Sequence, residues 1–131
     1  MIAVDTSALM AIVLDEPDAE ACAAVLASHD EIVISAGTVA EALIVAARRN
    51  VSLEMAKLIE GLGVTVVDVT PAAARRIADA YERWGKGLHP AGLNFGDCFA
   101  YGVAKERGCA LLCVGTDFAR TDLQSALPAP T

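Results

Sequence analysis

The sequence predicts one α/β domain in which helices cover both faces of a mainly parallel sheet of four to five strands. Short apolar or β-branched segments alternate with longer segments of helical periodicity, which is the element order of three-layer α/β/α folds. The chain has 131 residues, a length that fits one core, so we expect a single domain over residues 1–131. Aromatic residues are only 5% of the chain, which predicts a core of Ala, Val, Leu and Ile.

The N-terminal segment predicts one strand and two helices. Residues 2–4 form a short apolar run that ends at Asp5 and is typical of a strand. The hydroxyls of Thr6 and Ser7 can cap a helix that continues to about residue 14. Pro17 at a first helical position predicts a second helix to about residue 27.

The next strand is predicted at residues 32–35 and is followed by two helices. Thr38 can cap a helix that continues to about residue 49 and ends at Asn50. Residues 52–62 have a helical pattern that ends at the glycines in its last turn.

Residues 64–69 are the clearest β-branched run, and we expect them to form a central or paired strand. Thr70 and Pro71 then combine an N-cap with a proline at the first helical position, which predicts a helix to about residue 84. Residues 85–92 contain three glycines and one proline, so we expect a mobile loop over the side chain of Asp97.

Asp97 is a single carboxylate in the otherwise apolar opening of the next helix, which ends at Gly108. An acid in that place needs backbone N–H donors, the helix dipole or a cation. Residues 110–114 are typical of a buried strand. The final segment contains Pro128 and Pro130, and it can form at most a short edge strand.

The charge of the chain is unevenly distributed. Residues 1–47 contain eight acids and no Lys or Arg, whereas residues 48–131 contain nine acids and ten bases. The net charge of −7 argues against nonspecific coating of nucleic acid but allows a local basic rim around an acidic site. No apolar run can span a bilayer and the first residues lack a basic signal region, so we expect a cytoplasmic protein.

The cysteines are expected to be buried free thiols. Cys22, Cys98, Cys109 and Cys113 lie in apolar segments without CxxC spacing. That spacing does not favour a zinc site.

Four acids are predicted to meet at one edge of the sheet. Asp5 and Asp117 follow predicted strands, and Glu41 and Asp97 lie in the first turns of predicted helices. Ligands bind at the carboxyl ends of the strands in such folds, so this edge is the expected site.

Each of these acids also has an ordinary structural explanation. Glu41 can form a capping box with Thr38, as Asp97 can with Asn94, while the other two acids can form Asx turns. Four clustered carboxylates nevertheless repel unless cations compensate them, so together they suggest a divalent metal. Oxygen ligands favour Mg²⁺, with Mn²⁺ as a substitute, and such sites typically act on phosphate groups.

The order of these motifs resembles the PIN-domain ribonucleases, and most of all the VapC toxins of bacterial toxin–antitoxin pairs. The segments that carry the resemblance are Asp5-Thr6-Ser7-Ala8-Leu9, Glu41, Asn94-Phe95-Gly96-Asp97-Cys98, Gly115-Thr116-Asp117-Phe118 and Thr121-Asp122. The resemblance covers nearly the whole chain. It implies a PIN-like fold and a Mg²⁺- or Mn²⁺-dependent endoribonuclease, a toxin that hydrolyses RNA phosphodiesters with metal-activated water.

The resemblance also implies site residues and partners. The catalytic, metal-binding quartet falls on Asp5, Glu41, Asp97 and Asp117, with Thr6, Ser7 and Thr116 in support. Many relatives have Asn or Asp where this chain has Thr116, so the number of metal ions stays open. The implied partners are the RNA substrate, a VapB-type antitoxin that places an Arg or Lys among the acids, and a second copy of the toxin as homodimer or toxin–antitoxin hetero-oligomer.

Further residues have two interpretations each. Arg83, Lys86, His89 and Arg120 can contact RNA phosphates or serve as plain surface residues. Tyr81 and Trp84 can stack on bases or belong to the core, and Asp122 is an outer acid or part of a helix cap with Thr121. Leu9, Val13 and Val25 are expected to be exposed contacts for the antitoxin or a second copy.

Other functions with the same fold class fit less well. A phosphorylated receiver domain needs an acidic pair after the first strand and a lysine after the last, and an Asp-nucleophile phosphatase needs a second Asp where Ser7 stands. No strand is followed by a GxGxxG turn for a nucleotide cofactor. A metal-binding α/β regulatory or binding module without nuclease activity remains the alternative.

Overall fold

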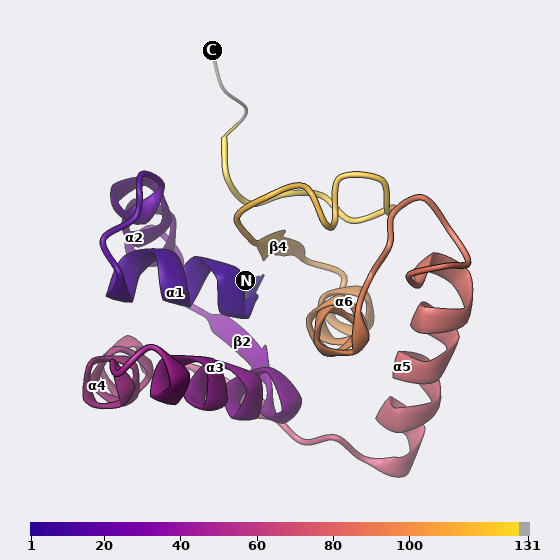
Figure 1. The fold of residues 1–131 in the computed structure, drawn as a ribbon, viewed down its shortest axis with the longest axis horizontal. Helices are drawn as coiled ribbons and strands as arrows, with labels where there is room; N and C mark the ends of the chain where they lie inside the picture. The colour runs from indigo at the N-terminus through magenta and orange to yellow at the C-terminus, as the bar shows by residue number, and fades with distance from the viewer. Residues whose placement is uncertain (129–131) are drawn as a thin grey trace.

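The computed structural model describes residues 1–128 and confirms the α/β fold (Figure 1). Its sheet has four parallel strands in the order β3-β2-β1-β4. The strands are β1 (Ile2–Val4), β2 (Ile32–Ser35), β3 (Thr65–Val67) and β4 (Ala110–Leu112). Because the chain leaves β1 toward β2 on one side and returns to β4 on the other, β1 lies at the switch point, where ligands of such sheets bind.

Six helices of the described chain cover the two faces of the sheet (Figure 1). They are α1 (Thr6–Val13), α2 (Ala19–Ala27), α3 (Ala36–Arg48), α4 (Ser52–Leu62), α5 (Pro71–Trp84) and α6 (Phe95–Arg107). Alternation along β1 separates two cores: Ile2 and Val4 join the one under α1 to α4, and Ala3 joins the one under α5 and α6. Among residues 1–128, no helix is long and apolar enough to cross a membrane.

The predicted starts of the first three helices were wrong by one to three residues. Asp5 rather than Thr6 or Ser7 caps α1, and Ser35 rather than Thr38 caps α3. Pro17 precedes α2, whose N-cap position is Asp18. The reason at α3 is that the Ser35 hydroxyl ends a buried strand and accepts the Gly37 N–H at 3.1 Å, so the helix begins directly from β2.

Thr38 therefore lies inside α3, and the capping box predicted for Thr38 and Glu41 is not formed. Thr38 is fully buried, and Glu41 lies in the second helical turn instead of the first. A capping explanation for Glu41 is thereby excluded.

The strand predicted at 64–69 is shorter and lies at the sheet edge. β3 pairs only with β2, so it is paired but not central, and Val66 is 46% exposed. The described part of the expected C-terminal edge strand is one bridge between Ser125 and Leu111. Pro130 lies outside the described residues.

The glycine-rich segment 85–92 is hydrogen-bonded to the chain that leads into α6. Gly85 forms a bridge with Leu93, and the Lys86 N–H donates to the Leu93 carbonyl at 2.9 Å. Gly87 and Gly92 have φ values of +86° and +65°, which an L side chain adopts only with strain. The mobility expected for this segment stays a prediction.

Candidate active site

Four different elements bring the predicted acids to the carboxyl edge of the sheet. Asp5 caps α1 directly after β1, Glu41 lies on α3, Asp97 opens α6, and Asp117 lies in the turn after β4. Asp5 and Asp97 are buried, Glu41 is half-buried and Asp117 is exposed. The edge therefore has a desolvated interior and a solvated rim.

Asp5 is held by Ser7 through one carboxylate oxygen. Its Oδ2 accepts the Ser7 N–H at 3.1 Å and the Ser7 hydroxyl at 2.7 Å, which confirms the Asx turn. The same hydroxyl accepts the Val114 N–H at 2.9 Å, so Ser7 joins the end of β1 to the end of β4. Oδ1 is buried without a hydrogen-bond partner. Burial and the charge of Glu41 raise the pKa of Asp5, although the hydrogen bonds from Ser7 lower it in part.

Asp97 forms the predicted capping box with Asn94. Its Oδ2 accepts the Asn94 N–H at 3.0 Å, and its own N–H donates to the Asn94 side chain at 2.8 Å. Burial raises the pKa of Asp97 to about 7 despite the Asn94 hydrogen bond, and the charges of Asp5, Asp117 and Glu41 raise it further. Asp97 is thus close enough to the other three carboxylates for their charges to disfavour its ionised form.

Glu41 lies between Thr6 and the backbone of α6. The Thr6 hydroxyl donates to Glu41 Oε1 at 2.5 Å. A Cβ on Gly96 would overlap the Glu41 carboxylate, and a Cβ on Gly37 would overlap the Phe99 ring, so α3 and α6 cross closely at two glycines. Neither close approach was predicted from the sequence, although a glycine inside a helix costs stability and is a signal of close packing.

Asp117 and Thr116 lie in an exposed turn after β4. Gly115 starts this turn with a φ of +96°, and the buried Phe118 ring anchors its other end. The turn places Asp117 at the rim, where its charge reaches Asp97.

The charges of the four acids are not compensated by basic side chains of the described chain. Its two ion pairs join Arg76 to Glu106 at 2.9 Å and Lys105 to Asp122 at 3.0 Å. Together with the unpartnered Asp5 Oδ1, this all-oxygen donor set fits a hard divalent cation. As placed, no three His, Cys, Asp or Glu of residues 1–128 converge on one metal position. Mg²⁺ needs only one or two direct carboxylates, so the fit rests on a few acids plus water.

The cysteines are free thiols, as predicted. Cys22, Cys98 and Cys113 are buried, and Cys109 is half-buried. Burial, together with nearby acids, raises the pKa of Cys98 to about 11 and that of Cys113 to about 12. Both thiols near the acids are therefore protonated at pH 7 in the metal-free chain.

The residues predicted to contact RNA lie in different surroundings. The Arg83 guanidinium lies over the Trp84 ring, with its Cζ 4.7 Å from the ring centroid. The His89 ring packs edge-on against the same indole, with the ring centroids 4.7 Å apart. Lys86 and Arg120 are exposed. Their contacts with RNA stay predictions. Trp84 itself is buried, so the core interpretation of this residue is confirmed.

Asp122 belongs to an anchor of the C-terminal segment and not to a helix cap. The Tyr101 hydroxyl accepts the Trp84 Nε1–H at 2.9 Å and donates to Asp122 Oδ1 at 2.7 Å. Lys105 pairs with the other carboxylate oxygen. Partial burial raises the pKa of Asp122, but the hydrogen bonds from Tyr101 and Lys105 outweigh it and lower the pKa below its usual value. Thr121 lies in a turn, where it accepts the Leu123 N–H at 3.3 Å.

The prediction of exposed apolar contacts on α1 and α2 is wrong for Leu9, whereas the contacts of Val13 and Val25 stay predictions. Leu9 is fully buried, and Val13 and Val25 are half-buried in the same core, because α1 packs between the sheet and its neighbouring helices. The large apolar side chains exposed near the acids are instead Ile44 on α3, at 61%, and Phe95 on α6, at 73%.

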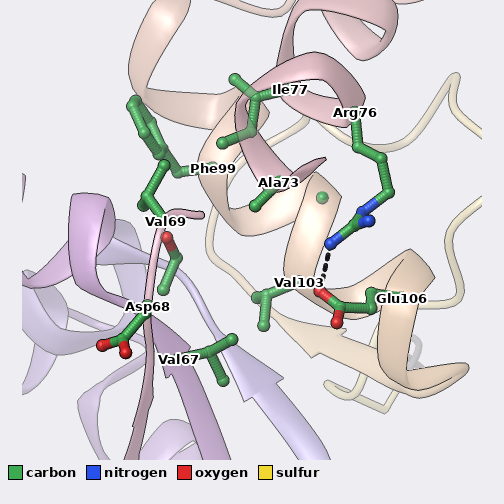
Figure 2. A pocket seen from close by; sticks show the side chains of 11 residues that line it. Val67, Asp68, Val69, Ala73, Arg76, Ile77, Phe99, Val103 and Glu106 are labelled. Atoms are coloured by element: carbon green, nitrogen blue, oxygen red, sulfur yellow. Dashed lines mark hydrogen bonds and ion pairs between the residues drawn. The ribbon is translucent and has the colours of Figure 1, made fainter. Parts of the chain in front are cut away.

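Three hollows surround Phe99, which contributes to the walls of all of them. The one in Figure 2 lies between β3, α5 and α6, has a volume of about 10 Å³ and includes the Arg76–Glu106 pair. It has room for about one water molecule. A hollow of about 490 Å³ is lined by residues of α5 and α6, and one of about 310 Å³ is lined by residues of α3 and α6. Only the last includes an acid of the quartet, Glu41.

The fold matches a known class of protein. The family model of the PIN domain matches residues 2–123. In overall shape the chain is similar to VapC20 of Mycobacterium tuberculosis, described as a sarcin–ricin loop cleaving toxin, with a TM-score of 0.80. That likeness covers 98% of this chain and 100% of the other at 19% identity, so it shows the fold.

Sequence similarity defines the group more closely. The chain is 43% identical over 129 residues to Ribonuclease VapC30 of Mycobacterium tuberculosis, which covers 95% of this chain and 98% of that relative. It is also similar, with a TM-score of 0.68 and 20% identity over 95% of this chain and 97% of the other, to VapBC2 from Rickettsia felis bound to a DNA fragment from their promoter. The chain therefore belongs to the PIN domain family and, within it, to the VapC ribonucleases.

Proposed function

We propose that this chain is a Mg²⁺- or Mn²⁺-dependent endoribonuclease that acts as the toxin of a toxin–antitoxin pair. The observation that carries the proposal is the placement of Asp5, Glu41, Asp97 and Asp117 at one edge of the sheet, with Asp5 Oδ1 buried and without a partner. In agreement, burial and three further carboxylates raise the pKa of Asp97 to about 7. No basic side chain of the described residues pairs with this quartet. Membership of the VapC ribonucleases supplies RNA as the substrate class.

Asp5 and Asp97 are the residues that would hold the ion most directly. They are the two buried acids, and Asp5 Oδ1 is a buried oxygen without a partner. Glu41 and Asp117 complete the negative edge from α3 and from the turn after β4. A bound divalent ion lowers the pKa of its water and polarises a phosphoryl oxygen, which is the chemistry that phosphodiester hydrolysis needs.

The side chains around the acids have positioning roles in this proposal. Ser7 fixes the Asp5 carboxylate against β4 through its two hydrogen bonds and the Val114 N–H. Thr6 holds Glu41 Oε1, which leaves the second oxygen of Glu41 available to accept a proton from the attacking water. No side chain serves as a covalent nucleophile.

The proposed antitoxin resembles the VapB partner of the solved VapBC2 complex. A cationic side chain of such a partner can occupy the acidic edge that the chain itself leaves without Lys or Arg. Antitoxin affinity should then fall as Mg²⁺ rises at constant ionic strength, because the two cations compete for the same carboxylates. A flat response would show that inhibition works elsewhere.

RNA cleavage by the purified chain tests the proposal. Cleavage should require Mg²⁺ or Mn²⁺, stop with EDTA and leave no covalent protein–RNA adduct. Cleavage that survives EDTA, or a trapped adduct, would contradict the mechanism. Metal binding without any RNA cleavage would favour the alternative of a metal-binding module.

A further inference from the structure

We propose that the hollow between α3 and α6 binds a nucleobase of single-stranded RNA beside the cleaved phosphate, with Phe95 as the stacking surface. This inference rests on the proposed ribonuclease function. The volume of this hollow, about 310 Å³, lies at the lower end of the range for small-molecule sites. Its walls come from Ile44, Val45, Phe95 and Phe99 and from the smaller residues of the α3–α6 crossing.

Phe95 is unusually exposed for an aromatic residue next to a buried acid. It is 73% exposed and stands two residues before Asp97, at the first position of α6. Phe99 contacts it edge-to-face, with ring centroids 5.0 Å apart and planes at 86°. Phe99 is itself half-buried and fixed over Gly37, so it supports Phe95 from one side and leaves the Phe95 ring accessible to a ligand.

The hollow and the acidic edge are continuous. Glu41 forms part of the wall of the hollow and also acts on the charge of Asp97. Gly96 lines the hollow between Phe95 and Asp97, and its missing Cβ leaves the space that Glu41 occupies. An RNA phosphate at the acids therefore brings its own base within reach of Phe95.

The chemistry of the walls favours a flat, apolar ligand face over a hydrogen-bonding one. Apart from Glu41, the lining side chains are aliphatic or aromatic. Such a surface recognises bases by stacking, which contributes about 1–3 kcal/mol per base by alanine substitution and gives a modest base preference through differences in stacking strength. Phe95 and Phe99 also line the hollow of about 490 Å³, but no acid of the quartet does, so the hollow that includes Glu41 is the one that adjoins the acidic edge.

The experiment compares cleavage of a random-sequence single-stranded RNA pool by the wild type and by Phe95→Ala, Phe95→Tyr and Leu53→Ala in Mn²⁺. Leu53 is the matched control because it is 62% exposed on α4 and lines neither hollow. Phe95→Ala should raise KM for RNA about tenfold, equivalent to about 1.4 kcal/mol, and flatten the base preference next to the cut, with unchanged Mn²⁺ affinity. Phe95→Tyr should restore both properties, and Leu53→Ala should behave as the wild type.

Two results would overturn the inference while leaving the ribonuclease intact. One is an unchanged KM and base preference in Phe95→Ala. The other is a difference in oligomeric state between Phe95→Ala and the wild type in sedimentation, which would show that a second copy of the chain covers this hollow. If the wild type cleaves no RNA with Mn²⁺, the proposed function itself fails, and the base-binding inference fails with it.

Discussion

Asp97 and Asp122 are two acids tied to the same helix, and their surroundings shift their pKa values in opposite directions. Asp97 is buried among three other carboxylates, and its pKa rises to about 7. Asp122 accepts hydrogen bonds from Tyr101 and Lys105 on α6, and its pKa falls. The chain thus places a cation on an acid that anchors its C-terminal segment and none on the acidic edge. Uncompensated charge at that edge lowers stability, and the proposed function explains it as a cost of cation binding.

The largest effects on activity and stability are expected when the buried acids Asp5 and Asp97 are neutralised. Asp5→Asn and Asp97→Asn should each lower metal-dependent RNA cleavage by at least about a hundredfold. The same variants should be more stable than the wild type without metal, because a buried charge and its repulsion are removed. Asp15→Asn is the control, since Asp15 lies in an exposed turn with a φ of +52° that Asn tolerates. Loss of stability in both buried variants would contradict the account.

The second-largest effect is expected in the pH dependence of the free energy of unfolding, which should distinguish Asp97 from Asp122. Asp97 has a raised pKa in the folded chain, so its contribution to metal-free stability is present below about pH 4 and is lost as pH rises to about 7. Asp122 has a lowered pKa, so its contribution is lost as pH falls. The measurement is the free energy of unfolding in urea. Its value for the wild type minus its value for Asp97→Asn should decline by a few kcal/mol between about pH 4 and 7. A difference that is constant across this range would show that Asp97 titrates normally.

The close approach of Glu41 can be disturbed without changing any acid. Gly96→Ala should displace the Glu41 carboxylate from the edge and lower kcat about tenfold or more, with a smaller loss of Mn²⁺ affinity. Gly61→Ala is the matched control, because a Cβ on this α4 glycine meets no other atom within 4 Å. The control should gain about 0.5–1 kcal/mol of stability and keep its activity. Equal activity in the two variants would refute the positioning role of Gly96.

The smallest effect is expected at the anchor. Tyr101→Phe removes the acceptor of the Trp84 N–H and the donor to Asp122. Its free energy of unfolding should fall by about 1–2 kcal/mol, while Mn²⁺ affinity stays that of the wild type. Altered metal affinity in Tyr101→Phe would mean that the anchor and the acidic edge are coupled.

The sequence predicted the elements well because their signals are local. Alternation, caps and glycines located the strands and helices, although the starts of α1, α2 and α3 were wrong by one to three residues. The Asn94–Asp97 capping box is formed as expected. The start of α3 was missed because Ser35 and Thr38 both offer a cap hydroxyl, and the helix begins directly at the end of β2, where the Ser35 hydroxyl accepts the Gly37 N–H. The sequence pattern alone does not say where the strand ends and the helix begins.

The site was predictable in its acids and not in their surroundings. Asp5 and Asp117 follow strands that a parallel sheet brings together, so their common edge follows from topology. The roles of Gly96 and Phe95 depend on how closely α3 crosses α6, which the sequence does not state. The exposed face of the chain was misplaced for the same reason, since Leu9 carries an apolar side chain whether it faces the core or the solvent.

The most direct test of the central claim is calorimetric titration of Mn²⁺ into the wild type, Asp5→Asn, Asp97→Asn and Asp122→Asn. The uncompensated acidic edge predicts one site that is weakened at least about tenfold in the first two variants and unchanged in Asp122→Asn. Mn²⁺ affinity that is the same in Asp5→Asn, Asp97→Asn and the wild type would contradict it.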